Sequence, residues 1–133
     1  MRYIAFVHKD PDSVYGVSFP DVPGCFSAGD TLDDAVRNAV DALSGHVRLL
    51  EADGDPVPLP RGFDAILSDD SLAEDREGAM LAVVPLLRDR GSTTRVNVSF
   101  DLGLLDAIDA AARDRGQTRS AFLASAARRE IVN

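Results

Sequence analysis

A short alternating stretch near the C-terminus most constrains what this chain can fold into. In residues 94–100 apolar side chains alternate with polar ones, which is the period of a strand with one apolar and one polar face. The apolar positions are Val96, Val98 and Phe100. A single strand is not stable by itself, and the nearest available partner is the same strand of a second copy. The stretch therefore predicts a dimer joined by a two-stranded ribbon.

The polar face of that ribbon suits DNA. The major groove admits a two-stranded ribbon, and arginine, asparagine and serine side chains match the donors and acceptors on base edges. The alternative is a solvent-facing strand with ordinary polar residues, but a short strand that leads into helices favours the reading role. We therefore expect Arg95, Asn97 and Ser99 to contact DNA bases.

Two helical patterns follow the stretch. Asp101 is placed to cap a helix over about 102–115, and Gly116 stands where helices commonly end in glycine. Thr118 then caps a second helix that runs to about Glu130. Free amides at the start of this second helix are suited to hold a DNA phosphate. The residues expected at that phosphate site are Thr118, Arg119 and Ser120.

Strand, helix, turn and helix in about forty residues resemble the ribbon-helix-helix family of DNA-binding domains. The resemblance covers roughly 94–131. Many members of that family have a proline directly after the strand, where this chain has Asp101. Gly103 weakens the first turn of the helix that follows.

Charge is distributed unevenly along the chain. The net charge is −8 over 133 residues, but residues 1–93 hold 8 Lys/Arg and 17 Asp/Glu, and residues 94–133 hold 6 and 5. The tail is therefore compatible with DNA, while the front repels it. An acidic front suits a basic partner, although acidic surfaces also serve solubility alone.

Composition indicates a globular protein of one ordinary or two small domains. No apolar run approaches the length of a membrane span, and the apolar N-terminus is interrupted at His8 too early for a secretory signal. The single cysteine, Cys25, excludes an internal disulfide and a cysteine-rich metal site. We expect a cytoplasmic protein with no membrane contact and no cofactor.

The front of the chain predicts three strands, a helix and a fourth strand. The strands are expected at 2–8, 14–19, 25–28 and 80–87, and 2–8 is apolar enough to be covered on both faces. The helix begins at Thr31, which stands with Asp34 in an acidic variant of the capping box, and ends near Gly54. Residues 55–62 are proline-rich and extended, and the acidic segment 64–77 is expected to be a loop or a short helix.

The front also carries a long motif. Residues 15–35 read YGVSFPDVPGCFSAGDTLDDA, and the pattern continues through Asn38-Ala39 and Asp41-Ala42-Leu43. This run resembles the HicB antitoxin family. The resemblance implies a partial ribonuclease-H-like fold and a partner, the HicA toxin, which is a small basic RNA-cleaving protein. It also implies that the pair represses its own operon through the antitoxin's DNA-binding domain, for which a ribbon-helix-helix tail is one known arrangement.

The expected fold class is therefore α+β in two domains. Residues 1–87 form a HicB-like toxin-binding domain, 88–93 a linker, and 94–133 a ribbon-helix-helix domain for DNA binding and dimerisation. Contacts between front domains would extend the dimer to a tetramer. Acidic groups on the helix are the expected docking points for the basic toxin, namely Asp33, Asp34 and Asp41.

Two other classes of protein are open to this sequence. One is a stand-alone ribbon-helix-helix regulator whose front domain senses a small molecule. The other is a metal-dependent ribonuclease, which needs several carboxylates that converge on divalent cations. Here the carboxylates fall in turns, on the outer face of the helix or in 64–77, which favours solvated side chains. We expect no catalytic residue and no metal, and packing roles for His46 and Cys25.

Overall fold

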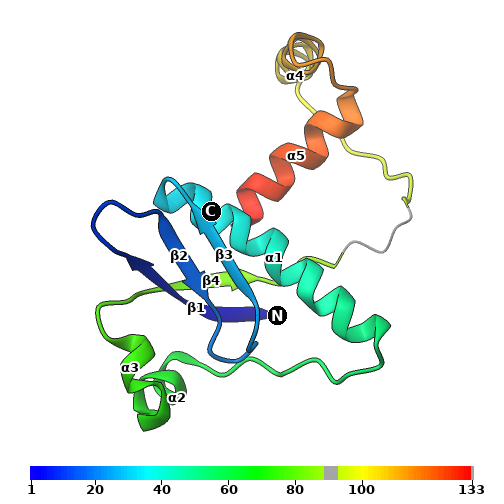
Figure 1. The fold of residues 1–133 in the computed structure, drawn as a ribbon. Helices are drawn as coiled ribbons and strands as arrows, with labels where there is room; N and C mark the ends of the chain where they lie inside the picture. The colour runs from blue at the N-terminus through cyan, green and yellow to red at the C-terminus, as the bar shows by residue number, and fades with distance from the viewer. Residues whose placement is uncertain (89–92, 133) are drawn as a thin grey trace. The chain divides into compact units, whose positions relative to one another are not determined.

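The fold is that of a computed structural model, which describes residues 1–88 and 93–132. The chain forms two compact units, Met1–Asp89 and Arg90–Asn133 (Figure 1). Most of the expected linker 88–93 lies outside the described residues.

The first unit is built on a four-stranded antiparallel sheet with strand order β3-β2-β1-β4 (Figure 1). Its strands are β1 (Arg2–Lys9), β2 (Tyr15–Ser18), β3 (Phe26–Gly29) and β4 (Met80–Pro85). All residues from Tyr3 to Val7 in the central strand β1 are buried, which confirms that this strand is covered on both faces. The α+β class and the order of three strands, helix and strand are confirmed.

The boundaries of β2 and β3 differ from the prediction. Strands were expected at 14–19 and 25–28, but the corner between them takes up the flanking residues in turns. The Val22 amide donates to the Phe19 carbonyl, and the Cys25 amide donates to the Val22 carbonyl, each at 3.2 Å. Those backbone groups are therefore occupied and do not join the sheet ladder. Strand β4 likewise ends at Pro85, two residues earlier than expected.

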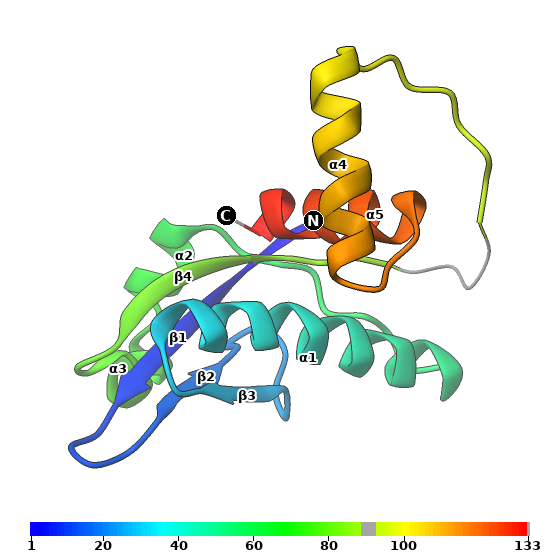
Figure 2. The same cartoon turned by 90° about the horizontal axis from the view of Figure 1, so that it is seen from above.

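Helix α1 (Leu32–Ala52) covers one face of the sheet (Figure 2). It begins as predicted, because the Thr31 side chain accepts a hydrogen bond from the Asp34 amide at 3.1 Å. It ends at Ala52, and Gly54, which follows the C-cap Asp53, has a φ of 75° in the left-handed region. The helix lies so close to β3 that a Cβ on Gly29 would be 2.3 Å from the Ala35 nitrogen. The side chains that it buries are Ala35, Ala39, Val40, Leu43 and Val47.

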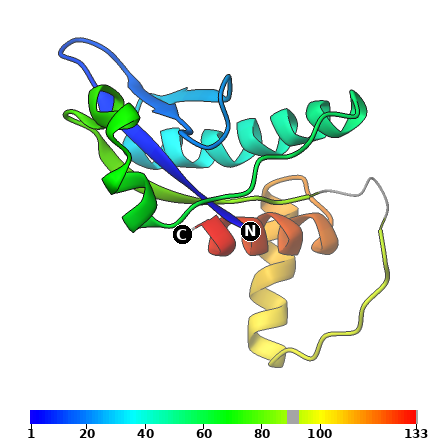
Figure 3. The same cartoon turned by 90° about the horizontal axis from the view of Figure 1, so that it is seen from below.

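Short helices cover part of the opposite face (Figure 3). They are α2 (Phe63–Ser68), η1 (Asp70–Leu72) and α3 (Ala73–Arg76), so the 64–77 segment is folded rather than an open loop. Ile66 of α2 is fully buried against Ile4 and Phe6 of β1. The Arg61 guanidinium links this layer to the rest of the unit, with contacts of 2.6 Å to Asp21 and 2.9 Å to Asp69.

The second unit contains α4 (Leu102–Asp114) and α5 (Arg119–Val132), at the positions that the sequence predicts. Asp101 caps α4 by accepting from the Leu104 amide at 3.2 Å, and α4 starts at Leu102 although Gly103 follows. Gly116 has a φ of 65°, and the next amide, that of Gln117, donates to the Ala112 carbonyl at 2.8 Å. This is a Schellman end, in which the last carbonyls of the helix find donors.

Residues 93–100 have no regular secondary structure in the single chain, whereas a strand was predicted at 94–100. A strand is defined by hydrogen bonds to a neighbouring strand, and an isolated extended segment has none. The single chain therefore leaves the expected ribbon open to a partner.

Candidate nucleic-acid and partner interfaces

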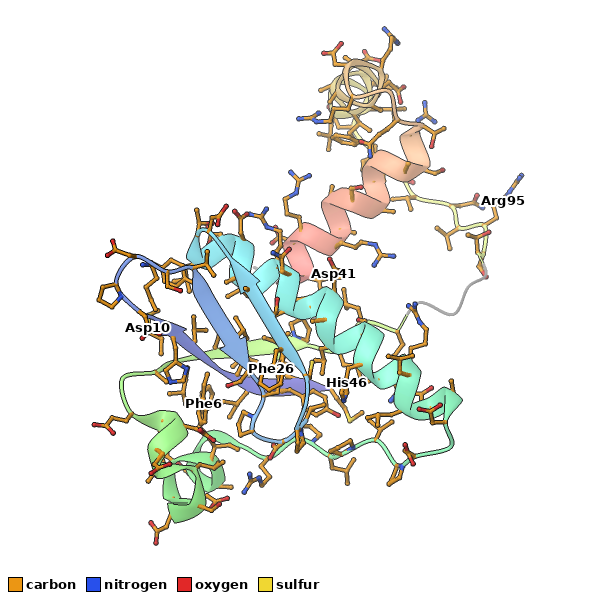
Figure 4. All side chains as sticks on the ribbon, viewed as in Figure 1. Phe6, Asp10, Phe26, Asp41, His46 and Arg95 are labelled. Atoms are coloured by element: carbon orange, nitrogen blue, oxygen red, sulfur yellow. The ribbon has the colours of Figure 1, made fainter. Side chains whose placement is uncertain are left out.

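The segment before α4 exposes its apolar side chains. Val96 is 72% exposed and Val98 is 65% exposed, although β-branched apolar residues at alternate positions normally face a core. Phe100, at the end of the segment, is half-buried. In Figure 4, Arg95 extends from the same segment. The apolar side of the segment is thus unburied within one chain.

Beside this segment lies an open hollow of about 890 Å³. Its apolar lining comes from the segment and from both helices of the second unit, namely Val96, Val98, Phe100, Leu105, Leu123 and Ala124. Protein interiors are packed with few voids larger than a water molecule, so a lining of this kind needs further apolar side chains to become a core. Arg95 and Asn97 border the same hollow, so the single chain does not separate a polar face from an apolar one.

The start of α5 holds the three residues expected to bind phosphate. The Thr118 hydroxyl accepts from the Ala121 amide at 3.1 Å and so caps the helix. Ser120 is exposed and borders the hollow. The Arg119 guanidinium makes two hydrogen bonds of 2.8 Å to the Asp109 carboxylate of α4, and they hold the pKa of that carboxyl below its usual value. Sequence reasoning missed this pair, because a separation of ten residues across a turn has no local signal.

The acidic residues expected to meet a toxin lie on α1. Asp33 and Asp41 are exposed, and Asp41 is labelled on the helix in Figure 4. Asp34 is half-exposed and lies 3.5 Å from the Arg37 guanidinium in an ion pair within the helix. Asp34 and Asp41 are seven residues apart and therefore share one side of α1, two turns from each other.

The remaining candidates pack as the sequence indicates. Cys25 is buried, and burial raises the pKa of its thiol to about 11, so at neutral pH it is a small apolar side chain. His46 is half-buried, and a Cβ on Gly24 would lie 3.6 Å from its Cε1 atom.

Within residues 1–88 and 93–132, no three His, Cys, Asp or Glu side chains are grouped as metal ligands. None of the described helices combines the length and apolar character needed to cross a bilayer.

These features define a two-unit α+β protein, with an acidic sheet-and-helix unit followed by a helix pair that leaves apolar surface open. The family model described as "HicB_like antitoxin of bacterial toxin-antitoxin system" matches residues 3–127. The chain belongs to this HicB-like antitoxin family. The resemblance found in residues 15–43 is therefore confirmed.

Individual relatives agree with the family. The chain is 32% identical over 136 residues to an uncharacterized 14.9 kDa protein of Haemophilus phage HP1, covering 100% of this chain and 99% of the relative. It is similar to the crystal structure of the Burkholderia pseudomallei antitoxin HicB, with 38% identity, 96% coverage of both chains and a TM-score of 0.58. It is also similar to a chain in the HicA3 and HicB3 toxin-antitoxin complex, with 34% identity, a TM-score of 0.54, and coverage of 65% of this chain and 98% of that one.

Proposed function

We propose that this chain is the antitoxin of a type II toxin–antitoxin pair. It binds and occludes a small HicA-like mRNA-cleaving toxin with its first unit, and it represses its own operon with its second. The observation that carries the proposal is the similarity to a chain of the HicA3 and HicB3 toxin-antitoxin complex. That chain matches about two thirds of this one, which is about the share that Met1–Asp89 holds.

Toxin capture by the first unit is a matter of binding, with no chemistry by this chain. Residues 1–93 carry a charge of −9, which draws a basic protein toward them and speeds the encounter. Asp33, Asp34 and Asp41 present part of this charge on α1. We assign the unit a partial ribonuclease-H-like fold, because its element order is three strands, a helix and a further strand.

We assign the second unit a ribbon-helix-helix fold, which is complete only in a dimer. In this arrangement residues 94–100 of two copies pair as antiparallel strands, and apolar side chains of the second copy fill the hollow that Val96, Val98 and Phe100 line with α4 and α5. The exposure of both valines in the single chain supports this assignment. Contacts between first units would join two such dimers into a tetramer.

Pairing of the strands would turn the alternate side chains outward. Arg95, Asn97 and Ser99 then lie on the ribbon face that enters the major groove and contact base edges. The amides at the start of α5, with Thr118, Arg119 and Ser120, hold a backbone phosphate and fix the register of the ribbon. Because Asp109 occupies two of the Arg119 donors, this arginine meets phosphate in an orientation that the ion pair sets.

The proposal is tested by growth and RNA integrity. A short basic reading frame found beside this one is expressed alone and then together with this chain. We expect growth arrest with RNA cleavage when it is alone, and rescue with co-purification when both are present. A harmless neighbour, or a failure to rescue, would contradict toxin capture and leave the second unit to be pursued as an independent regulator.

A further inference from the structure

On the sheet face opposite α1, the edge strand β3 is exposed in the part of the chain that the structure describes. Gly29 of β3 points at α1, so alternation along the strand turns Phe26 and Ala28 to the other side. Register places Ser18 beside Phe26 and Gly16 beside Ala28 on that same side. Phe26 is 70% exposed, although Ile4 and Phe6 of β1 on the same face are buried beside Ile66 of α2. Figure 4 labels Phe26 on β3 and Phe6 on β1.

Gly16 is unusual at this place. It lies inside β2, where glycine destabilises a strand relative to a residue with a side chain. Its φ is not in the left-handed region, and a Cβ added to it would meet nothing within 4 Å. Neither backbone conformation nor crowding within the described chain therefore requires glycine here. Glycine inside a strand often marks a bulge, a tight bend or a close approach of a ligand or another backbone, and β2 pairs in continuous register on both sides, which favours close approach.

The surrounding side chains give this face the shape of a docking surface. Gly16, Ser18 and Ala28 are small and form a low floor, and Phe26 projects at one end of it. Aromatic side chains, including phenylalanine, are enriched at protein interfaces relative to the rest of the surface. We name these four residues the β2–β3 face.

Exposed carboxylates flank the other end of the β2–β3 face. Lys9 at the end of β1 pairs with Tyr15 of β2, and Tyr15 pairs with Gly29 at the end of β3. The residues that follow β1 and those that follow β3 therefore lie at the same end of the sheet. Those residues include Asp10, Asp12 and Asp30, all of them exposed. Lys9, the last residue of β1, adds one positive charge beside them, and its ammonium donates to the Asp10 carbonyl at 3.1 Å. The rim is therefore net negative.

We propose that the β2–β3 face is the surface on which a small basic toxin docks, with Phe26 as the anchor and Gly16 as the point of closest backbone approach. The proposal rests on the antitoxin function proposed above. A second copy of this chain fits the face less well, because it would bring a like-charged rim against this one. The α1 carboxylates lie on the opposite side of the sheet and act on the encounter through long-range attraction without contact.

Two substitutions in the full-length chain test the face. Phe26→Ala removes the exposed anchor, and Gly16→Val places a strand-favouring side chain over the floor without strain. The control is Leu49→Ala, which removes a side chain that is 66% exposed on α1. Affinity is measured by titration calorimetry against a catalytically inactive form of the toxin. Oligomer mass is measured by sedimentation equilibrium, and folding is checked by thermal melting.

We expect both face variants to bind on the order of tenfold more weakly or worse, and Leu49→Ala to bind as the wild type does. We also expect Gly16→Val to melt no lower than wild type, which separates a blocked surface from a damaged fold. Wild-type affinity in both face variants would overturn the docking surface while the antitoxin function stands. A smaller oligomer with unchanged toxin affinity would show that a second copy occupies the face, which also overturns the inference. If the wild type does not bind the toxin, the proposed antitoxin function and the proposed docking role of the β2–β3 face are both wrong.

Discussion

The Arg119 guanidinium of α5 and the Asp109 carboxylate of α4 form a two-bond ion pair, with both hydrogen bonds at 2.8 Å. The Arg115 guanidinium lies 5.4 Å from the centre of the Phe122 ring and links the same two helices. The pair fixes the direction of the Arg119 side chain at the start of α5. Because the guanidinium is planar and rigid, the Arg119 donors that do not bind Asp109 are then held in one direction.

The first prediction follows from this pair. We expect Arg119→Ala to weaken DNA binding and to reduce the slope of log affinity against log salt by about 0.9, the contribution of one phosphate contact. Asp109→Asn leaves the positive charge in place, so we expect it to keep the wild-type slope and to lower affinity less. Fluorescence anisotropy with operator DNA over a series of salt concentrations measures both. If Arg119→Ala has the same slope of log affinity against log salt as the wild type, Arg119 does not contact a phosphate. Its role would then be to hold α5 against α4.

The second prediction concerns the ribbon. Val98→Asp puts a carboxylate where the dimer core is proposed, and an unpaired charge in a core costs several kcal/mol, on the order of the free energy of a weak dimer. We therefore expect sedimentation equilibrium to show a smaller oligomer than that of the wild type. The matched control is Ser99→Asp, which adds the same charge one residue away, on the proposed DNA face. It should keep the wild-type mass and lose DNA affinity. If Val98→Asp keeps its mass, residues 94–100 are not the interface.

Local signals in the sequence predicted most of the elements. Thr31, Asp101 and Thr118 each cap the helix that they were expected to cap, because a capping side chain and the amide that it binds are three residues apart. The left-handed glycines Gly54 and Gly116 end α1 and α4 for a similarly local reason.

Features that depend on distant contacts could not be predicted in this way. Arg61 reaches Asp21 across forty residues of sequence, and nothing near either residue indicates the other. The exposed position of Phe26 depends on which strand of the sheet α2 packs against, which is likewise a tertiary property. In the sequence, Phe26 only suggested a strand.

The third prediction uses the Arg61 contacts. Hydrogen bonds from Arg61, and then from Ser71, lower the pKa of Asp69 to about 2. The unfolded chain has the ordinary value of about 3.9 for this carboxyl. A depressed folded-state pKa adds stability above the unfolded value, and that stability is lost as pH falls from about 4 to about 2. Asp69→Asn lacks this contribution at every pH.

Thermal melting across this range tests the third prediction. We expect the difference in melting temperature between the wild type and Asp69→Asn to be largest above about pH 5 and to shrink as the pH approaches about 2. Asp41→Asn, on the exposed side of α1, is the control for loss of one carboxylate and is melted over the same pH range. A constant difference for Asp69→Asn down to about pH 2 would contradict the lowered pKa.

The fourth prediction concerns base reading by Asn97. A side-chain amide can make two hydrogen bonds to the edge of an adenine, and such a contact discriminates against the wrong base by about 1–3 kcal/mol. Asn97→Ala should therefore lower affinity for the operator by roughly one to two orders of magnitude and leave non-specific DNA binding nearly unchanged. Toxin affinity should stay at the wild-type value, because Asn97 is in the second unit. Competition between operator and random-sequence DNA measures the selectivity. If operator affinity is also unchanged, Asn97 does not lie on the face of the ribbon that enters the groove.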